Sequence, residues 1–323
     1  MVKLLFKVLR YTLILIIFIL TLLLTVPYFF SIPQYALAKG ARPFPESKFA
    51  VIHGHTIHYR EWNSTSDSAI GNIILIHGFS GSTFSWRKNI TALREAGYNI
   101  LIPDIPPFGF STKDSNANYS VGANAALVWK LAEVLHPGFR WTLVGHSMGA
   151  SIAGAMAALK PSQTNKVVFV DGIFDGIHKT TGLNLTGYLL SSGPVKQLAE
   201  VLGKYQLYNY KTFEKLLQSA YSKKPDSLDV VGYLRPFKLN GIAGGILAMS
   251  NSEEISSLSS NEIISPVFII WGKFDDWLPL SKWSPLFKKY PTAEMKIIDG
   301  AGHCPMETNA NEFNSLLLKF ISN

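Results

Sequence analysis

The 323-residue sequence predicts an α/β fold: a mostly parallel sheet flanked by helices, with a helical segment inserted late in the chain. Three observations predict it. Short apolar runs of strand length recur along the chain, and helix-length segments with apolar residues at every third or fourth position lie between them. Strands that alternate with helices form a parallel sheet covered on both faces. One long interval breaks the alternation and contains only helical patterns.

The first expected strands lie near residue 50. Residues 49–62, "FAVIHGHTIHYREW", predict two short strands around a turn. Six more apolar runs are typical of buried parallel strands; they lie at residues 72–79, 98–105, 141–147, 166–172, 266–272 and 294–300. The segments 84–97 and 122–135 are the expected helices between them.

The interval that breaks the rhythm runs from about Gly172 to Asn261. It contains helical stretches such as "GPVKQLAEVLGKY" and "KTFEKLLQSAYSKK", and it predicts a helical lid inserted after the strand at 166–172. The expected domains follow from these elements. They are an N-terminal anchor or signal peptide with the start of a linker (1–38), a first core part (39–171), the lid (172–261) and a second core part (262–323).

The charge of the chain is unevenly distributed. The net charge is +8, but the first 50 residues carry six basic side chains against one acidic, whereas the other 273 carry 24 against 21. The excess therefore flanks an apolar segment and does not form a basic stripe on a folded domain. This distribution indicates membrane topology and argues against a nucleic-acid partner.

The apolar segment is residues 11–30, "YTLILIIFILTLLLTVPYFF". At about 1.5 Å per residue it extends for about 30 Å, the thickness of a bilayer's hydrocarbon core. Because the apolar region of a signal peptide is usually shorter, the segment predicts an uncleaved membrane anchor. The alternative is a signal peptide cleaved near Ala38, which would give a secreted protein. Basic residues flank both ends almost equally, and we expect a cytoplasmic tail with the folded domain outside.

One serine lies in a cramped setting between two glycines. The stretch "GHSMG" places Ser147 between Gly145 and Gly149, after the expected strand 141–147 and before a run of small residues. This spacing matches the G-x-S-x-G elbow, in which a tight turn from strand to helix presents the hydroxyl at the carboxyl edge of a sheet. A serine in that position is a candidate nucleophile.

Four further motifs occur in the order expected around such a serine. They are "HGFSGSTFSW" after the strand 72–79, "DIPPFGFS" at 104–111, "WGKFDDWLP" at 271–279 and "GAGHCPME" at 300–307. With these motifs the chain, from about residue 53 to 320, resembles the α/β-hydrolase family, and most of all its small esterases and monoacylglycerol-lipase-like members. One departure is Pro107, which stands where the family's Asp-x-Pro-Gly-x-Gly-x-Ser loop usually has glycine.

The resemblance implies a role for each motif. Ser147 is the expected nucleophile, His303 the base and Asp275 the acid of a catalytic triad. The backbone N–H groups of Phe79 and Met148 are the expected oxyanion hole. This chemistry implies neither a metal nor an organic cofactor.

Two other acid assignments stay open at this stage. Asp276 would be the acid if the loop were shifted by one residue, and Asp171 or Asp175 after the preceding strand is a further position. Three tryptophans around this loop (Trp271, Trp277 and Trp283) are expected to pack there.

The histidines outside the expected triad also have competing interpretations. His77 and His146 are expected to pack or to bond to backbone. "HGHTIH" resembles a zinc ligand set, but in an extended strand His53 and His55 would share a face while His58 points away.

The nucleophile type narrows the expected reaction. Dehalogenases and epoxide hydrolases of this family carry aspartate at the elbow, and the chain has serine. The remaining expectation is hydrolysis of a carboxylic ester with an apolar or lipid-derived acyl chain, for which Leu189, Leu190 and Phe237 would line the acyl channel. C–C bond hydrolysis and cofactor-free perhydrolysis use the same residues and stay as alternatives. So does a non-catalytic ligand-binding protein of the same fold.

Overall fold

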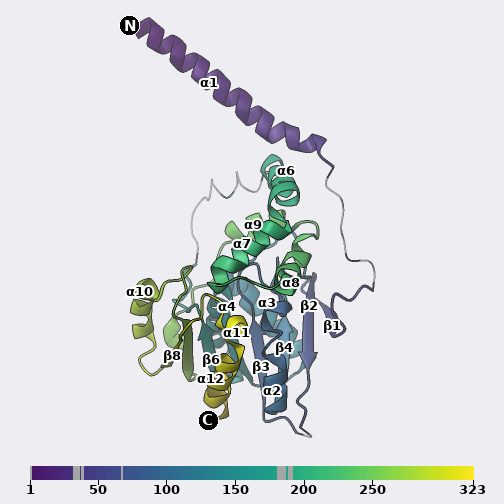
Figure 1. Cartoon of the computed structure of the whole chain (residues 1–323), viewed down its shortest axis with the longest axis vertical. Helices are drawn as coiled ribbons and strands as arrows, with labels where there is room; N and C mark the ends of the chain where they lie inside the picture. Colours follow the sequence, from purple (N-terminus) through teal and green to yellow (C-terminus); the bar gives the residue numbers. More distant parts are fainter. Residues whose placement is uncertain (1, 32–36, 38–39, 67, 180–186, 188–191) are drawn as a thin grey trace.

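Eight strands form a single sheet in a computed structural model that describes residues 2–31, 37, 40–66, 68–179, 187 and 192–323 (Figure 1). Their order across the sheet is β1-β2-β4-β3-β5-β6-β7-β8. The strands are β1 (Ser47–Ile52), β2 (His55–Trp62), β3 (Gly71–Ile76), β4 (Tyr98–Pro103), β5 (Trp141–His146), β6 (Thr164–Val170), β7 (Val267–Gly272) and β8 (Glu294–Ile298).

The sheet is mostly parallel, as the sequence predicts. β4, β3, β5, β6, β7 and β8 run parallel to one another, whereas β2 pairs antiparallel with both β1 and β4. Each predicted apolar run forms one of these strands. The carboxyl ends of the parallel strands therefore meet at one edge, where an α/β sheet places its reactive side chains.

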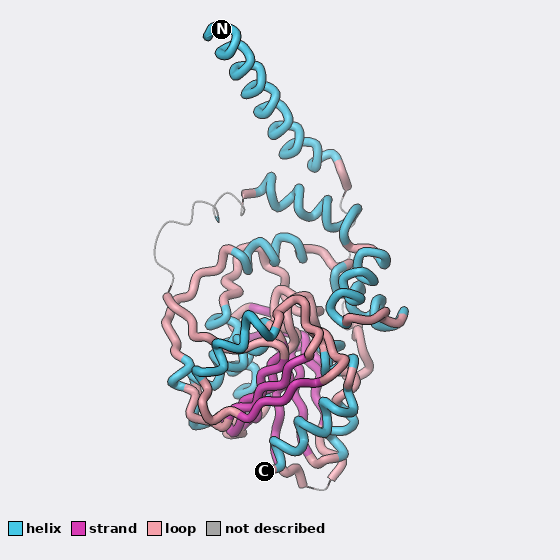
Figure 2. The backbone as a smooth tube through the Cα atoms, turned by 60° about the vertical axis from the view of Figure 1, so that its left-hand side comes forward, coloured by secondary structure: helices cyan, strands magenta, loops and turns pink. Residues whose placement is uncertain are grey.

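Helices cover both faces of this sheet (Figure 2). Successive side chains of β3 point to opposite faces, and both faces are apolar. Ile74 and Ile76 pack into one apolar cluster with α3 (Val121–Leu135) and α4 (Met148–Leu159). Ile73 and Leu75 point to the other cluster, which includes α12 (Ala310–Ser322). A strand buried on both faces is apolar at every position, and that is the pattern visible in the sequence.

The expected helix at 84–97 is divided in the structure. Ser82 caps the short 3₁₀ helix η2 (Thr83–Trp86), and α2 (Ile90–Glu95) follows it. Two other short helices, α10 (Leu280–Trp283) and α11 (Pro305–Thr308), follow β7 and β8.

Between β6 and β7 the described residues form helices and an isolated bridge between Ile177 and Leu258. We call residues 192–250 the insertion; it comprises α6 (Gly193–Leu202), the π-helical turn η4 (Gly203–Leu207), α7 (Tyr210–Tyr221), α8 (Ser227–Phe237) and α9 (Ile242–Ser250). In Figure 1 it lies over the edge of the sheet where the parallel strands end.

A partly buried cation fastens the insertion to the sheet domain. The Arg87 guanidinium pairs with Asp229 of α8 and with Glu307 of α11. Hydroxyl groups of the insertion also reach Glu307: the hydroxyl of Tyr221 donates to Glu307 Oε2 at 2.8 Å, and that of Tyr233 donates to Oε1. Three helices are thus held around a single guanidinium.

The N-terminal helix α1 (Val2–Thr25) continues into the short helix η1 (Val26–Phe29) and projects away from the sheet (Figures 1 and 2). The stretch Lys3–Phe29 is long and apolar enough to cross a membrane, and nearly all of it is exposed. A signal sequence has the same properties. The predicted cleavage position at Ala38 lies outside the described residues.

Candidate active site

Ser147 lies on a strained turn between β5 and α4. Its φ angle is 52° with ψ of −120°, a conformation that side-chain-bearing residues rarely adopt. A Cβ at Gly145 would overlap the carbonyl oxygen of Gly149, and a Cβ at Gly149 would overlap that of Ile76. The two glycines of the motif are therefore required for strand, turn and helix to approach so closely.

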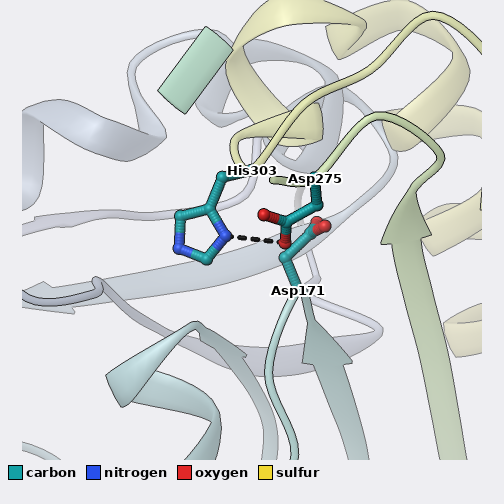
Figure 3. A group of neighbouring side chains, drawn as sticks. All are labelled: Asp171, Asp275 and His303. Atoms are coloured by element: carbon teal, nitrogen blue, oxygen red, sulfur yellow. Dashed lines mark hydrogen bonds and ion pairs between the residues drawn. The ribbon is translucent and has the colours of Figure 1, made fainter. Parts of the chain in front are cut away.

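Ser147, His303 and Asp275 form a continuous hydrogen-bonded chain, which we call the Ser147 triad. His303 Nε2 lies 3.0 Å from Ser147 Oγ. His303 Nδ1 lies 2.8 Å from Asp275 Oδ2, the contact drawn as a dashed line in Figure 3. His303 is 156 residues from the serine and sits in the loop after β8, where its N–H donates to the Ala220 carbonyl. The predicted triad residues thus come together at one edge of the sheet.

Asp275 is positioned by backbone as well as by His303. Its Oδ1 accepts hydrogen bonds from the N–H groups of Trp277 and Leu278, both at 2.9 Å. Burial opposes ionisation, but the bond to His303 and the backbone donors hold the pKa of Asp275 below its ordinary value. Asp275 is therefore a carboxylate that can steady a protonated imidazole. Asp276, the shifted alternative, is exposed.

Asp171, another alternative acid, lies directly beside Asp275 at the end of β6 (Figure 3). Atoms of Asp171, Asp275 and His303 lie within 4.8 Å of one another. Asp171 Oδ1 accepts the N–H of Gly272 at 2.8 Å. Burial, and then the charge of Asp275, raise the pKa of Asp171 well above its usual value. The two pKa values move in opposite directions, because ionisation of two adjacent carboxyl groups is unfavourable; the charge is therefore favoured on Asp275 and the proton on Asp171.

The same three groups are a candidate metal site by their ligand types. A metal ion needs deprotonated carboxylates and a free imidazole nitrogen. Here the raised pKa of Asp171 favours its protonated form, and His303 Nδ1 is bonded to Asp275. The arrangement favours proton transfer over metal binding. Asp175, the remaining acid alternative, pairs with Lys289 at the surface.

The predicted oxyanion groups flank the serine. Among the described residues, neither the N–H of Phe79 nor that of Met148 has a hydrogen-bond acceptor. A Cβ at Gly78 would come within 3.0 Å of Ser147 Cβ, so this glycine lets the loop after β3 approach the serine. Both N–H groups are therefore available to a ligand oxygen.

A cavity of about 180 Å³ opens onto the Ser147 hydroxyl. Its lining is mostly apolar; the described lining side chains include Phe79, Phe213, Leu216, Leu217, Ala220, Tyr233 and Trp277. Four of these residues belong to α7. Leu189 and Leu190 lie outside the described residues, and Phe237 packs on Phe213 at a centroid distance of 4.9 Å without lining the cavity.

Trp277 is a site residue that the sequence did not single out from its tryptophan cluster. Its ring lies over His303, with centroids 5.1 Å apart, and its Nε1–H donates to Ser219 of α7 at 2.9 Å. Trp271, by contrast, is fully buried and donates to the Leu278 carbonyl. Trp283 packs against the core at the edge of the sheet.

Two buried histidines beside the triad bond to backbone, as predicted. His77 Nδ1 donates to the Gly78 carbonyl, and its Nε2 accepts the N–H of Ile105. His146 Nε2 lies 2.7 Å from the His303 carbonyl oxygen. Burial lowers the pKa of His77, and burial together with His303 lowers that of His146 to about 3. Both rings are neutral supports.

A second Ser–His–Asp hydrogen-bonded chain occurs at the antiparallel end of the sheet. His58 Nδ1 lies 2.6 Å from Asp104 Oδ2, and His58 Nε2 lies 2.8 Å from Ser47 Oγ. We call these residues the Ser47 triad. His58 is thus fully engaged away from the suggested zinc set, and His53 lies in the turn, not in a strand.

The loop that contains Pro107 forms around the acid of the Ser47 triad. Asp104 Oδ2 accepts the N–H of Phe110 at 2.7 Å, and Ser111 Oγ donates to the Asp104 carbonyl at 2.7 Å. A cavity of about 810 Å³ lies beside it, lined among others by Ser47 and Ser111. This cavity is larger than the one at Ser147, yet it contains none of the Ser147 triad.

Comparison with known proteins agrees with this geometry. Residues 71–310 match the family described as alpha/beta hydrolase fold. The chain belongs to that family. This α/β-hydrolase is 27% identical over 279 residues to the uncharacterized hydrolase YugF of Bacillus subtilis. The matched region covers 84% of this chain and 96% of that protein. It is 25% identical to a 2-hydroxy-6-oxononadienedioate/2-hydroxy-6-oxononatrienedioate hydrolase of Burkholderia vietnamiensis, over 82% and 90% of the two chains.

Solved structures share the fold of this hydrolase. A crystal structure described as a membrane phospholipase A, a bacterial virulence factor, has a TM-score of 0.65 at 21% identity and covers 98% of both chains. A bromoperoxidase from Bacillus anthracis has a TM-score of 0.66 at 20% identity, over 86% of this chain and 100% of its own. At these identities the likeness is one of fold.

Proposed function

We propose that the protein is a serine hydrolase that cleaves carboxylic esters with an apolar, lipid-derived acyl chain. The observation that carries the proposal is the Ser147 triad, whose hydroxyl faces a mostly apolar cavity. In this proposal Ser147 is the nucleophile, His303 the general base and Asp275 the acid that holds the imidazole. The N–H groups of Phe79 and Met148 bind the oxyanion.

The geometry supports a two-step reaction. Ser147 Oγ attacks the acyl carbonyl while His303 Nε2 takes its proton, and the carbonyl oxygen becomes an oxyanion held by the two N–H groups. When the tetrahedral intermediate collapses, the bond to the alcohol breaks and His303 returns the proton to the alcohol oxygen. Water then attacks the acyl-enzyme by the same route and releases the acid.

The cavity lining supports an uncharged substrate over a dianionic one. The Burkholderia vietnamiensis relative is named for a dioate, which carries two carboxylates. Among the described residues that line the Ser147 cavity, none is a lysine or arginine. Burial of a carboxylate without a cation is costly, so the lining favours an ester over that C–C bond substrate. Perhydrolysis would use the same triad and stays the second candidate because of the bromoperoxidase-like fold.

The N-terminal helix supports a site of action at a membrane. We infer that Lys3–Phe29 is a single membrane anchor, with the catalytic domain on the extracytoplasmic side. An anchored hydrolase would meet lipid-derived esters at the bilayer surface. Extraction with alkaline carbonate tests this part: an anchored chain stays with the membrane, and a soluble chain that begins near residue 39 contradicts it.

Labelling by a fluorophosphonate probe tests the chemistry. The wild-type chain is expected to react at Ser147, and Ser147→Ala is expected to lose the label while remaining folded by circular dichroism. A panel of p-nitrophenyl esters and monoacylglycerols of graded length then tests the substrate class. Preference for acetate and butyrate esters, or faster cleavage of the dioate, would contradict the proposed acyl specificity.

A further inference from the structure

The insertion is in direct contact with the end of the N-terminal helix. Gln197 of α6 donates through Nε2 to the Pro27 carbonyl at 3.1 Å, and the Tyr205 hydroxyl donates to the Ser31 carbonyl at 2.7 Å. The rings of Phe30 and Tyr205 meet edge to face at 5.8 Å. Figure 1 shows α6 lying at the end of α1 that is nearer the sheet. The insertion, and not the sheet, therefore adjoins the proposed anchor.

The position of this contact follows from the length of the apolar helix. The stretch Lys3–Phe29 contains 27 residues, enough for about 40 Å of helix, whereas the hydrocarbon core of a bilayer is about 30 Å thick. If the stretch spans the bilayer, its end lies at the lipid–water interface. Tyr28, of a residue type enriched at that level, is exposed there, and so are its neighbours Phe29 and Phe30.

An apolar surface on the insertion adjoins this helix end. We call it the apolar end face; it consists of the exposed residues Leu202, Tyr205, Leu207 and Tyr210. Leu202 is 45% exposed and Leu207 is 52% exposed, although both are large apolar side chains. The four residues lie within nine positions of the chain, and several large side chains left exposed in one segment are typical of an interaction surface. If Lys3–Phe29 is a membrane anchor, a surface beside its end would face the bilayer.

The helix α7 connects the apolar end face to the nucleophile. It begins at Tyr210, within the apolar end face, and its residues Phe213, Leu217 and Ala220 line the Ser147 cavity. These positions are three, seven and ten residues after Tyr210, so they lie on one face of the helix. The ten residues extend over about 15 Å. One face of α7 thus runs from the apolar end face to the cavity at Ser147.

We propose that the apolar end face docks into the lipid–water interface and that an apolar substrate passes from the bilayer along α7 to Ser147. This rests on the proposed ester hydrolysis and on the proposed anchor, and it adds a second membrane contact to the spanning helix. The lipid partner is recognised by its acyl chains, since the surface supplies apolar and aromatic side chains.

Nitroxide scanning of the full chain in phosphatidylcholine nanodiscs tests the docking. The one native cysteine, Cys304, is buried, so the reagent should react with an introduced cysteine, and the unsubstituted chain is the control for this. Labels at Leu202→Cys and Leu207→Cys are expected to collide more with oxygen than with a water-soluble nickel complex. A label at Val134→Cys on α3, which is 55% exposed, should show the reverse.

The position Ile17→Cys, in the middle of α1, separates the possible failures. If Ile17 is lipid-exposed but Leu202 and Leu207 resemble Val134, the docking is overturned while the anchor stands. If Ile17 also resembles Val134, both are overturned.

Activity provides the second measurement. Leu202→Lys with Leu207→Lys is expected to lower the cleavage of a bilayer-embedded monoacylglycerol at least tenfold and to leave the cleavage of a soluble p-nitrophenyl ester within twofold. Equal loss on both substrates would overturn the proposed route. Failure of the wild-type chain to cleave the soluble ester would instead contradict the proposed function.

Discussion

The molecule contains two Ser–His–Asp chains with the same order of hydrogen bonds and different surroundings. In both, the imidazole Nδ1 bonds to the carboxylate and Nε2 to the serine hydroxyl. In the Ser47 triad the serine lies in the edge strand β1 and is 2% exposed. Its Oγ also accepts the N–H of Phe44 at 2.9 Å, so the hydroxyl is already engaged in a structural turn.

The Ser147 triad differs in what surrounds the hydroxyl. Its serine lies on a positive-φ turn, next to two N–H groups without acceptors among the described residues, and it opens onto an apolar cavity. The comparison teaches that the same three side chains can have very different surroundings. Because Ser47 also borders a cavity, the difference lies in the strained turn, the N–H groups without acceptors and the second hydrogen bond to the Ser47 hydroxyl.

The largest expected difference between the two triads is at the nucleophile. Ser147→Ala removes the attacking oxygen and should lower kcat by about 10⁴-fold or more. The loss should be visible in the steady-state hydrolysis of a soluble ester by a variant whose unfolding midpoint matches wild type. Retention of a tenth of the wild-type kcat would show that another group attacks the substrate.

The acids of the two triads should support different properties: Asp275 supports catalysis, and Asp104 supports stability. Asp275→Asn leaves His303 without its anionic partner and should lower kcat by about 10³- to 10⁴-fold, with a small change in stability. Asp104→Asn removes the partner of a buried histidine and should lower the free energy of unfolding by about 3 kcal/mol while the folded fraction keeps its kcat. Urea titration and active-site titration measure the two effects. Similar changes in kcat and in the free energy of unfolding for both variants would contradict this difference between the two acids.

The neutral Asp171 should make stability depend on pH. Its pKa is raised in the folded state, so the folded chain holds a proton that the unfolded chain releases above about pH 4. This contribution is complete below that pH and is lost as the pH rises. Asp171→Asn cannot ionise and should therefore gain stability relative to wild type by up to about 1.4 kcal/mol per pH unit between pH 5 and 8.

Thermal unfolding over this pH range measures the gain. The matched control is Asp175→Asn, because Asp175 is exposed and paired with Lys289 at the surface. It should follow the wild-type pH profile. Parallel profiles for all three proteins would mean that Asp171 is ionised in the folded state.

The smallest expected effect is at the serine of the second triad. Ser47→Ala removes the hydroxyl that contacts His58 and should lower the free energy of unfolding by about 1 kcal/mol. The kcat for a soluble ester and the fluorophosphonate labelling should not change. A fall in labelling comparable to that of Ser147→Ala would give the Ser47 triad a catalytic role that its surroundings do not support.

Much of the fold was predictable because its strands are buried on both faces. β7 is buried at every position and β3 is buried and apolar from Ile73 to Ile76, and such runs can be recognised without knowledge of the partner strands. The Ser147 triad was predictable because each member lies in a short motif whose order along the chain is diagnostic. The helical insertion was visible as an interruption of the alternation, although its lining residues were not.

The features that could not be predicted from the sequence depend on contacts between elements that lie far apart along the chain. His58 and Asp104 are 46 residues apart and belong to no shared motif, so the Ser47 triad required the pairing of β2 with β4. The neutral state of Asp171 depends on its distance from Asp275, which follows from the adjacency of β6 and β7. In the sequence nothing distinguishes Trp277 from Trp271 and Trp283, and only the fold places its ring over His303.

The guanidinium of Arg87 limits how the insertion can be exchanged. A chimera that received the corresponding helices of a relative would keep the Arg87–Glu307 pair, but Arg87 would lose its second acid and Glu307 its two hydroxyl donors, unless the donor segment supplied an acid at position 229 and hydroxyls at 221 and 233. Transplantation of substrate preference between such hydrolases therefore has to carry both sides of this charged junction together.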